Sequence, residues 1–233
     1  FFRQNFSQVT NPPIDSLRER RVMSLRTRLG NLGNILDETE EQCEHLLLES
    51  PVLSNAEFQA MRDYMGDTAE EIDCTFDVSG GETALAEAID RIQREAEDAV
   101  RGGCTHVVLS DKTICSTRAA IPMILATGAV HSYLVRQQLR TFTSINVQTG
   151  ECLDTHYFCV LIGVGATTVN AYLAQEAIAD RHARGLFGDK SLDACVGAYR
   201  KAIQDGILKV MSKMGISVLS SYRGGYNFES VGL

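Results

Sequence analysis

The sequence lacks a run of basic residues. Its net charge is −8, and the densest positive cluster, residues 18–21, is interrupted by Glu19. A nucleic-acid surface needs clustered positive charge to neutralise phosphates. The composition therefore argues against nucleic-acid binding, and the cluster is interpreted as a solvated helix face.

Cysteine spacing suited to a metal or iron–sulfur centre is also missing. The seven cysteines, at positions 43, 74, 104, 115, 152, 159 and 195, include no Cys-x-x-Cys pair. An odd number at irregular spacing predicts neither a disulfide framework nor a zinc site. We therefore expect free thiols and a reducing, cytoplasmic setting.

A long uninterrupted apolar run is absent as well. The longest apolar stretch, residues 119–139, is broken by Pro122, Gly128, His131 and Arg136. These interruptions favour a buried helix over a membrane span. With 44% apolar and 22% charged residues, the chain is typical of a soluble globular protein.

What the sequence does contain is an alternation of short apolar strands with longer helices. We predict strands at residues 71–76, 104–110, 142–147 and 157–162. Predicted helices begin at a Ser79–Glu82 capping box, at about 117, after the 163–167 turn and at 194, and an earlier helix begins near Ser54 or Asn55. Such alternation predicts an α/β fold of parallel βα units. A partial or TIM-barrel-like domain and an open doubly wound sheet both fit it.

The chain divides at a polar, glycine-rich stretch between residues 182 and 193. We predict a domain boundary there, with one unit at 1–190 and the start of another at 191–233. The apolar pair Phe1-Phe2 at the start and the unfinished glycine-rich stretch 208–233 at the end indicate a segment of a longer polypeptide.

Few residues have the pattern of a reactive site. Gly163-Val164-Gly165 lies between a predicted strand and a predicted helix, as a dinucleotide-binding loop would, but the third glycine and the distal acidic residue are missing. A tight turn is the favoured interpretation. Asp111 follows a predicted strand, where parallel α/β proteins place catalytic groups, although a loop-bonding or helix-capping role is the stronger hypothesis.

The histidines do not suggest a metal site. His106, His131 and His156 belong to different predicted elements and have no ligand spacing, so we expect structural roles for them. No catalytic, cofactor-binding or metal-binding residue is predicted within the chain.

An ordered series of short motifs runs along the chain. The motifs lie at residues 8–18, 22–26, 33–34, 50–53, 75–76, 110–111, 120–122, 129–131, 139–140, 161–163 and 170–173. In this order they resemble the central domain of the large subunit of glutamate synthase. Residues 209–217 and 221–224 resemble the opening of that enzyme's FMN-binding (β/α)8 synthase domain.

The resemblance implies that the parent enzyme converts L-glutamine, 2-oxoglutarate and reductant into two molecules of L-glutamate. An amidotransferase domain releases ammonia and the synthase domain uses FMN. Electrons arrive through a three-iron iron–sulfur cluster, either from ferredoxin or from NADPH by way of a small flavoprotein subunit that carries FAD and further clusters. NADPH is the expected donor.

The resemblance further implies that this segment binds no cofactor and is inactive alone. It is expected to connect the amidotransferase and FMN domains and to line the ammonia tunnel at Thr10 and Asn11. The proline-flanked stretch is predicted to be extended, so its carbonyls are free to accept hydrogen bonds from ammonia, although a structural turn is equally open. The alternative is a standalone FMN- or phosphate-binding α/β barrel protein that holds the anion at helix N-termini and glycine loops.

Overall fold

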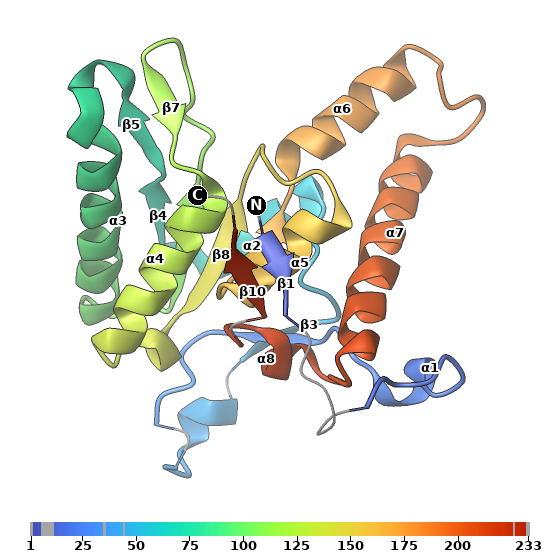
Figure 1. The fold of residues 1–233 in the computed structure, drawn as a ribbon, viewed down its shortest axis with the longest axis horizontal. Helices are drawn as coiled ribbons and strands as arrows, with labels where there is room; N and C mark the ends of the chain where they lie inside the picture. Colours follow the sequence, from blue (N-terminus) through green and yellow to red (C-terminus); the bar gives the residue numbers. More distant parts are fainter. Residues whose placement is uncertain (1, 6–11, 35, 44, 226, 232–233) are drawn as a thin grey trace.

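The computed structural model describes residues 2–5, 12–34, 36–43, 45–225 and 227–231 (Figure 1). Its helices are α1 (Glu19–Val22), α2 (Asn55–Met65), α3 (Ala84–Arg101), α4 (Met123–Arg136), α5 (Thr155–Gly163), α6 (Tyr172–Ala183), α7 (Leu192–Lys213) and α8 (Leu219–Tyr222). Its strands are β1 (Phe2–Gln4), β2 (Thr27–Leu29), β3 (Leu46–Leu48), β4 (Ala69–Asp73), β5 (Thr75–Asp77), β6 (His106–Ser110), β7 (Arg118–Ala120), β8 (Ser144–Gln148), β9 (Thr168–Asn170) and β10 (Phe228–Ser230).

The centre of the fold is a four-stranded parallel sheet in the order β4-β6-β8-β9. Neighbouring strands in the sheet are consecutive parallel strands in the chain, joined in turn by α3, α4 and α5. These helices pack in sequence on one face, α3 against α4 and α4 against α5 (Figure 1). Sequential strands with every crossover helix on one face are the winding of a (β/α) barrel. The described sheet is open, and the predicted α/β class with parallel βα units is confirmed.

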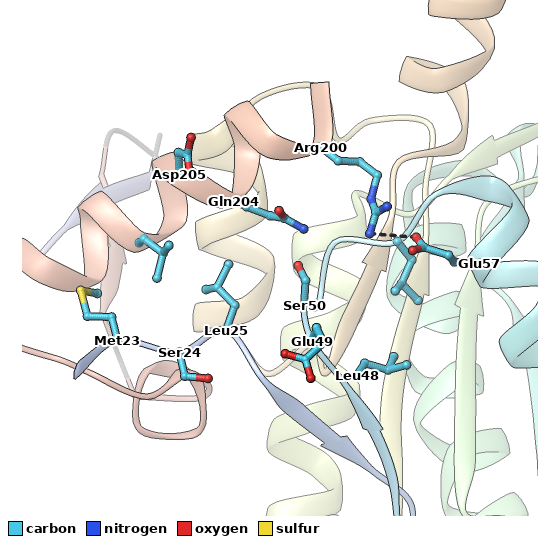
Figure 2. A pocket seen from close by; sticks show the side chains of 12 residues that line it. Met23, Ser24, Leu25, Leu48, Glu49, Ser50, Glu57, Arg200, Gln204 and Asp205 are labelled. Atoms are coloured by element: carbon cyan, nitrogen blue, oxygen red, sulfur yellow. Dashed lines mark ion pairs between the residues drawn. The ribbon is translucent and has the colours of Figure 1, made fainter. Parts of the chain in front are cut away.

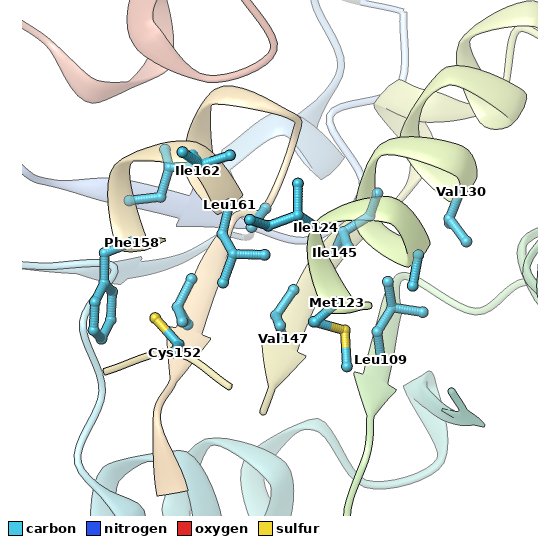
Figure 3. Close-up of a cluster of buried hydrophobic side chains, with 14 of the residues drawn as sticks. Leu109, Met123, Ile124, Val130, Ile145, Val147, Cys152, Phe158, Leu161 and Ile162 are labelled. Carbon is cyan, nitrogen blue, oxygen red and sulfur yellow. The ribbon is translucent and has the colours of Figure 1, made fainter. Parts of the chain in front are cut away.

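Strand β6 shows why the sheet lies at the centre of the core. Val107 and Leu109 join the cluster under α3 and α4, whereas Val108 points the other way, toward Phe58 and Met61 of α2. Successive strand residues face opposite sides, so this apolar strand buries both faces. Figure 3 shows the larger cluster, in which sheet residues such as Leu109 and Val147 meet α4 and α5. Each fully buried aliphatic side chain contributes about 1.5–3 kcal/mol relative to exposure.

The outer edge of β9 is covered by the segment that leads into α2. Val169 donates its backbone N–H to the Pro51 carbonyl (2.8 Å), and Leu53 donates to the Val169 carbonyl (3.0 Å). Ser54 then caps α2 in a capping box with Glu57, as one of the two predicted caps. The motif at 50–53 thus closes a sheet edge that would otherwise be unpaired.

The predicted strand at 157–162 is wrong. These residues belong to α5, and the Asp154 carboxylate caps this helix by accepting the Tyr157 N–H (2.9 Å). The fourth strand of the sheet is instead β9, which follows the helix. Because α5 packs between α4 and α7, it is apolar on nearly every side. A short helix of this kind cannot be distinguished from a buried strand by periodicity. Cys159 therefore lies on a helix, not on a strand.

Three other helix starts differ from the predictions. The helix expected from 117 begins only at Met123, after Pro122, because residues 118–120 pair as β7 with β5. The capping box at Ser79 does not form, since Gly81 has a positive φ of 76° and α3 begins at Ala84. The helix expected directly after the 163–167 turn begins only at Tyr172, because residues 168–170 form β9. Each helix starts later than predicted because a strand or a local turn precedes it.

The described residues after 190 pack on the same core as the preceding part of the chain. Helix α7 contacts α5 and α6, and Ile207, Met211 and Tyr222 join the main apolar cluster. Strand β10 pairs antiparallel with β1. The division at 190/191 stays a prediction. Among the described helices, none is both long and apolar enough to cross a membrane.

Candidate functional site

The carboxyl end of β6 carries Asp111, the residue with the most reactive-looking position in the sequence. Its buried carboxylate accepts hydrogen bonds from the Thr149 hydroxyl (2.6 Å) and the Gly150 backbone N–H (3.0 Å), both after β8. Burial raises the pKa of Asp111, and these hydrogen bonds act in the opposite direction. Asp111 ties two loops together, which confirms the loop-bonding hypothesis.

Glu151 is a second acid at this edge, and the sequence analysis missed it. Its carboxylate accepts the first backbone N–H of α4, from Met123 (2.9 Å), and the Tyr157 hydroxyl. Burial, together with the Glu151 hydrogen bond and charge, raises the pKa of Tyr157. Its position just after a strand is the same signal that singled out Asp111. Glu151 fixes the starts of α4 and α5.

A third acid, Asp73, ends β4 and holds the β5–β7 pair. Its carboxylate accepts from the Thr113 hydroxyl (2.6 Å) and from the Arg118 guanidinium (2.7 Å). Burial alone acts to raise the pKa of Asp73, but hydrogen bonds from Thr113 and Thr75 and the Arg118 charge lower it. The carboxylate is thus a charged structural joint.

The α2 side of the sheet carries a row of polar side chains that hydrogen-bond to one another. Thr168 donates to the Asn146 amide oxygen (2.8 Å), and the Asn146 amide nitrogen donates to Ser144 (3.2 Å). Ser144 also meets His106 Nδ1 (2.8 Å), and burial lowers the pKa of His106 to about 4. His106 is therefore neutral at pH 7, and this row is a satisfied buried network.

The Gly163–Gly165 turn packs against a histidine, His131, and an arginine, Arg140. Arg140 donates to His131 Nδ1 (3.0 Å) and to the Gly165 carbonyl (2.9 Å). A guanidinium only donates, so His131 Nδ1 accepts and the neutral ring carries its hydrogen on Nε2. Burial, with the Arg140 and Arg223 charges, lowers the pKa of His131 to about 4.

Other side chains of the protein occupy the space beside both glycines of this turn. A Cβ at Gly165, where φ is +124°, would lie 2.3 Å from the His131 ring, and one at Gly163 would lie 2.9 Å from Phe228. The favoured tight turn is confirmed. The turn offers no open cradle for a flavin or nucleotide phosphate, so the described residues do not fit FMN at this position.

A hollow of about 410 Å³ lies between the β2–β3 hairpin and α7. Figure 2 shows Arg200 reaching from α7 to Glu57, with an ion-pair distance of 2.9 Å, and Arg200 also donates to the Val52 carbonyl (3.1 Å). Glu49 and Asp205 line the same hollow. Its one arginine is already paired with Glu57, and this ion pair links α7 to α2 across the hollow.

The predicted tunnel residues, Thr10 and Asn11, lie outside the described residues. The chain that follows runs beside the end of α7, where Ile14 donates its N–H to the Ser212 carbonyl (2.8 Å). His156 packs edge-on against Phe228 at 5.8 Å between ring centroids. In the part of the chain that the structure describes, no three His, Cys, Asp or Glu side chains come together to hold a metal.

Fold and polar groups together define an α/β domain with barrel-type winding, whose strand-end acids bond to their own loops. Comparison with known proteins gives the family. The model of the glutamate synthase central domain matches residues 1–233, and the chain belongs to that family.

Curated relatives cover the whole chain. It is 73% identical to the large chain of the NADPH glutamate synthase of Azospirillum brasilense, 40% to the NADH glutamate synthase of Saccharomyces cerevisiae and 40% to the chloroplastic ferredoxin-dependent glutamate synthase of Spinacia oleracea. The chain spans only 15%, 11% and 15% of these proteins. Among solved structures, the flavin-binding domain of baker's yeast flavocytochrome b2 matches 60% of the chain, and 35% of that protein, with 14% identity and a TM-score of 0.44.

Proposed function

We propose that the parent protein converts L-glutamine, 2-oxoglutarate and reductant into two molecules of L-glutamate, and that this segment is its connecting scaffold. The observation that carries the proposal is the 73% identity over the full chain to a glutamate synthase large chain. The chain spans 15% of that relative, so the reaction is assigned to regions outside it.

A scaffold role agrees with the chemistry of the domain. The carboxylates of the three strand-end acids accept hydrogen bonds from neighbouring loops and helices of the same domain. These acids are Asp111, Glu151 and Asp73. Residues 1–190 would follow the amidotransferase domain, and residues 191–233 would lead toward the FMN domain. We expect no glutamate formation by the isolated segment, measured by amino-acid analysis with glutamine, 2-oxoglutarate and a reductant. Turnover by the segment alone would contradict the proposal.

The cofactors are assigned to the rest of the parent enzyme. FMN and a three-iron cluster would lie in its synthase domain, and NADPH would reduce them through a small flavoprotein subunit carrying FAD. Support for NADPH comes from the 73% identity to the large chain of the NADPH glutamate synthase of Azospirillum brasilense. Assaying the purified parent with NADPH plus that subunit, and with reduced ferredoxin, tests this assignment.

We also propose that Thr10 and Asn11 line the ammonia tunnel. Replacing either with Trp in the parent enzyme should suppress glutamine-dependent synthesis more than synthesis from added ammonia, because only the former uses the tunnel. Leu17→Trp is the matched control, since Leu17 is 88% exposed. Equal loss of both rates at position 10 or 11 would show a folding defect and overturn the tunnel assignment.

Titration of the segment with FMN tests the standalone alternative. The scaffold proposal predicts no stoichiometric binding, measured as a change in the flavin absorption spectrum. Tight one-to-one binding would favour a separate flavin barrel.

A further inference from the structure

Two arginines lie close together, and neither has an acidic partner among the described residues. Arg140 donates its N–H groups to neutral acceptors, which are the carbonyls of Thr143 and Gly165 and the ring of His131. The Arg223 guanidinium makes one hydrogen bond among the described residues, to the Thr27 hydroxyl at 3.3 Å. Burial lowers the pKa of both arginines, and the Arg223 charge lowers that of Arg140 further. Burying positive charge without a counter-charge is unfavourable.

Arg223 opens onto a pocket of about 450 Å³ beside β2. Arg26 and Arg28 line the same pocket. Arg26 is paired with Glu49 at 2.9 Å, whereas Arg28 forms no ion pair within the described ranges. Within the part of the chain that the structure describes, the pocket therefore carries two arginines that form no ion pair, Arg28 and Arg223, and the net charge of the chain is −8.

The same pocket has an apolar rim. Leu47 and Val218 line it and are 48% and 42% exposed. A small inorganic anion would use only the two cations. A peptide segment with an acidic side chain next to apolar ones would use both features, because it would also remove Leu47 and Val218 from water.

Most of the parent polypeptide lies outside this chain. The 233 residues span 15% of the relative to which they are 73% identical. A segment of the same polypeptide can therefore supply such a contact without a separate binding partner.

We propose that the pocket formed by Arg28, Arg223, Leu47 and Val218 receives an acidic side chain, flanked by apolar residues, from a part of the parent polypeptide outside residues 1–233. The carboxylate accepts N–H groups from both arginines, which compensates the positive charge shared with Arg140. Its apolar neighbours cover Leu47 and Val218. The inference rests on the proposal that the chain is part of a larger enzyme.

The test uses the full-length parent enzyme carrying Arg28→Lys. A water-soluble carbodiimide joins a lysine amine to a carboxylate in direct contact, and peptide mapping by mass spectrometry identifies the linked residue. We expect an amide between position 28 and one Asp or Glu outside the segment, and loss of that link when Arg223→Gln is added. Arg136→Lys is the control, since Arg136 is exposed on α4 and should give no link to that acid.

Two results would overturn the inference. One is a link from position 28 only to Glu49 or to no acid, in a variant that retains the wild-type activity. The other is no link, together with a rise in Tm on adding inorganic phosphate that Arg223→Gln abolishes, which would define a small-anion site. Neither result contradicts the proposed function. A parent enzyme that forms no glutamate would contradict the proposed function, but the cross-link could still be interpreted.

Discussion

Asp111 and Arg223 are both charged side chains held largely away from water, yet their surroundings differ. Asp111 accepts hydrogen bonds from Thr149 and Gly150, two groups of a neighbouring loop. The Arg223 guanidinium has one hydrogen bond among the described residues, at 3.3 Å, and lies near a second arginine, Arg140. A buried charge with its partners in the same domain is a structural joint. A buried charge without such partners favours the proposed contact with another part of the parent polypeptide.

The largest effect is expected from displacing the histidine behind the arginines. Gly165→Ala places a methyl group 2.3 Å from the His131 ring at a φ of +124°, so it should destabilise the parent enzyme's domain by about 3 kcal/mol or more. Thermal unfolding of the variant measures the loss. Gly197→Ala is the control, because no atom lies within 4 Å and alanine favours a helix by about 0.5–1 kcal/mol. Similar Tm values for the two variants would contradict the packing.

Breaking the structural joint comes next. Asp111→Ala leaves the Thr149 hydroxyl and the Gly150 N–H without their acceptor, so it should cost about 2–3 kcal/mol in urea unfolding. Asp90→Ala, on the exposed face of α3, should change the free energy by less than about 0.5 kcal/mol. If both substitutions had the same small effect, Asp111 would not be a joint.

Acid should weaken the two histidine sites. Folding lowers the pKa of His131 and His106 to about 4 from the ordinary 6.5, so between these values the unfolded chain binds more protons. Stability is therefore complete above pH 6.5 and falls as the pH drops toward 4, by roughly 1–2 kcal/mol per histidine after allowing for solvent. Chemical unfolding as a function of pH measures it. His131→Gln should flatten the slope, and an unchanged slope would rule out His131 as its source.

The smallest effect sharpens the comparison most. Arg28→Gln should alter the unfolding free energy of the 233-residue segment by less than about 0.5 kcal/mol, because Arg28 is exposed and unpaired in the described structure. In the parent enzyme the same substitution should cost more, since it would break a contact between domains. Urea unfolding of both proteins checks this difference, and equal costs would argue against that contact.

Much of the fold followed from local patterns. Strand β6 was predicted from its continuous apolar run, and the start of α2 was placed at Ser54 or Asn55, of which the structure selects Ser54 as the cap. Helix α5 was mistaken for a strand because it is buried on nearly every side, which removes the polar face that reveals a helix. Of the polar sites, Asp111 was found by its strand-end position, whereas the Arg140–Arg223 pair could not be found, because its members are 83 positions apart in the numbering of the chain.

The sequence by itself determined the parallel βα class, the ordered motifs of the family and the absence of metal spacing among the cysteines. Tertiary structure alone decided which charges are paired. Hydrogen bonding and burial depend on groups brought together from distant parts of the chain, as when Arg140 of the loop after α4 meets Gly165 of the turn after α5. Sequence patterns report the periodicity of one segment, whereas charge compensation is a property of the assembled core and of whatever packs against it.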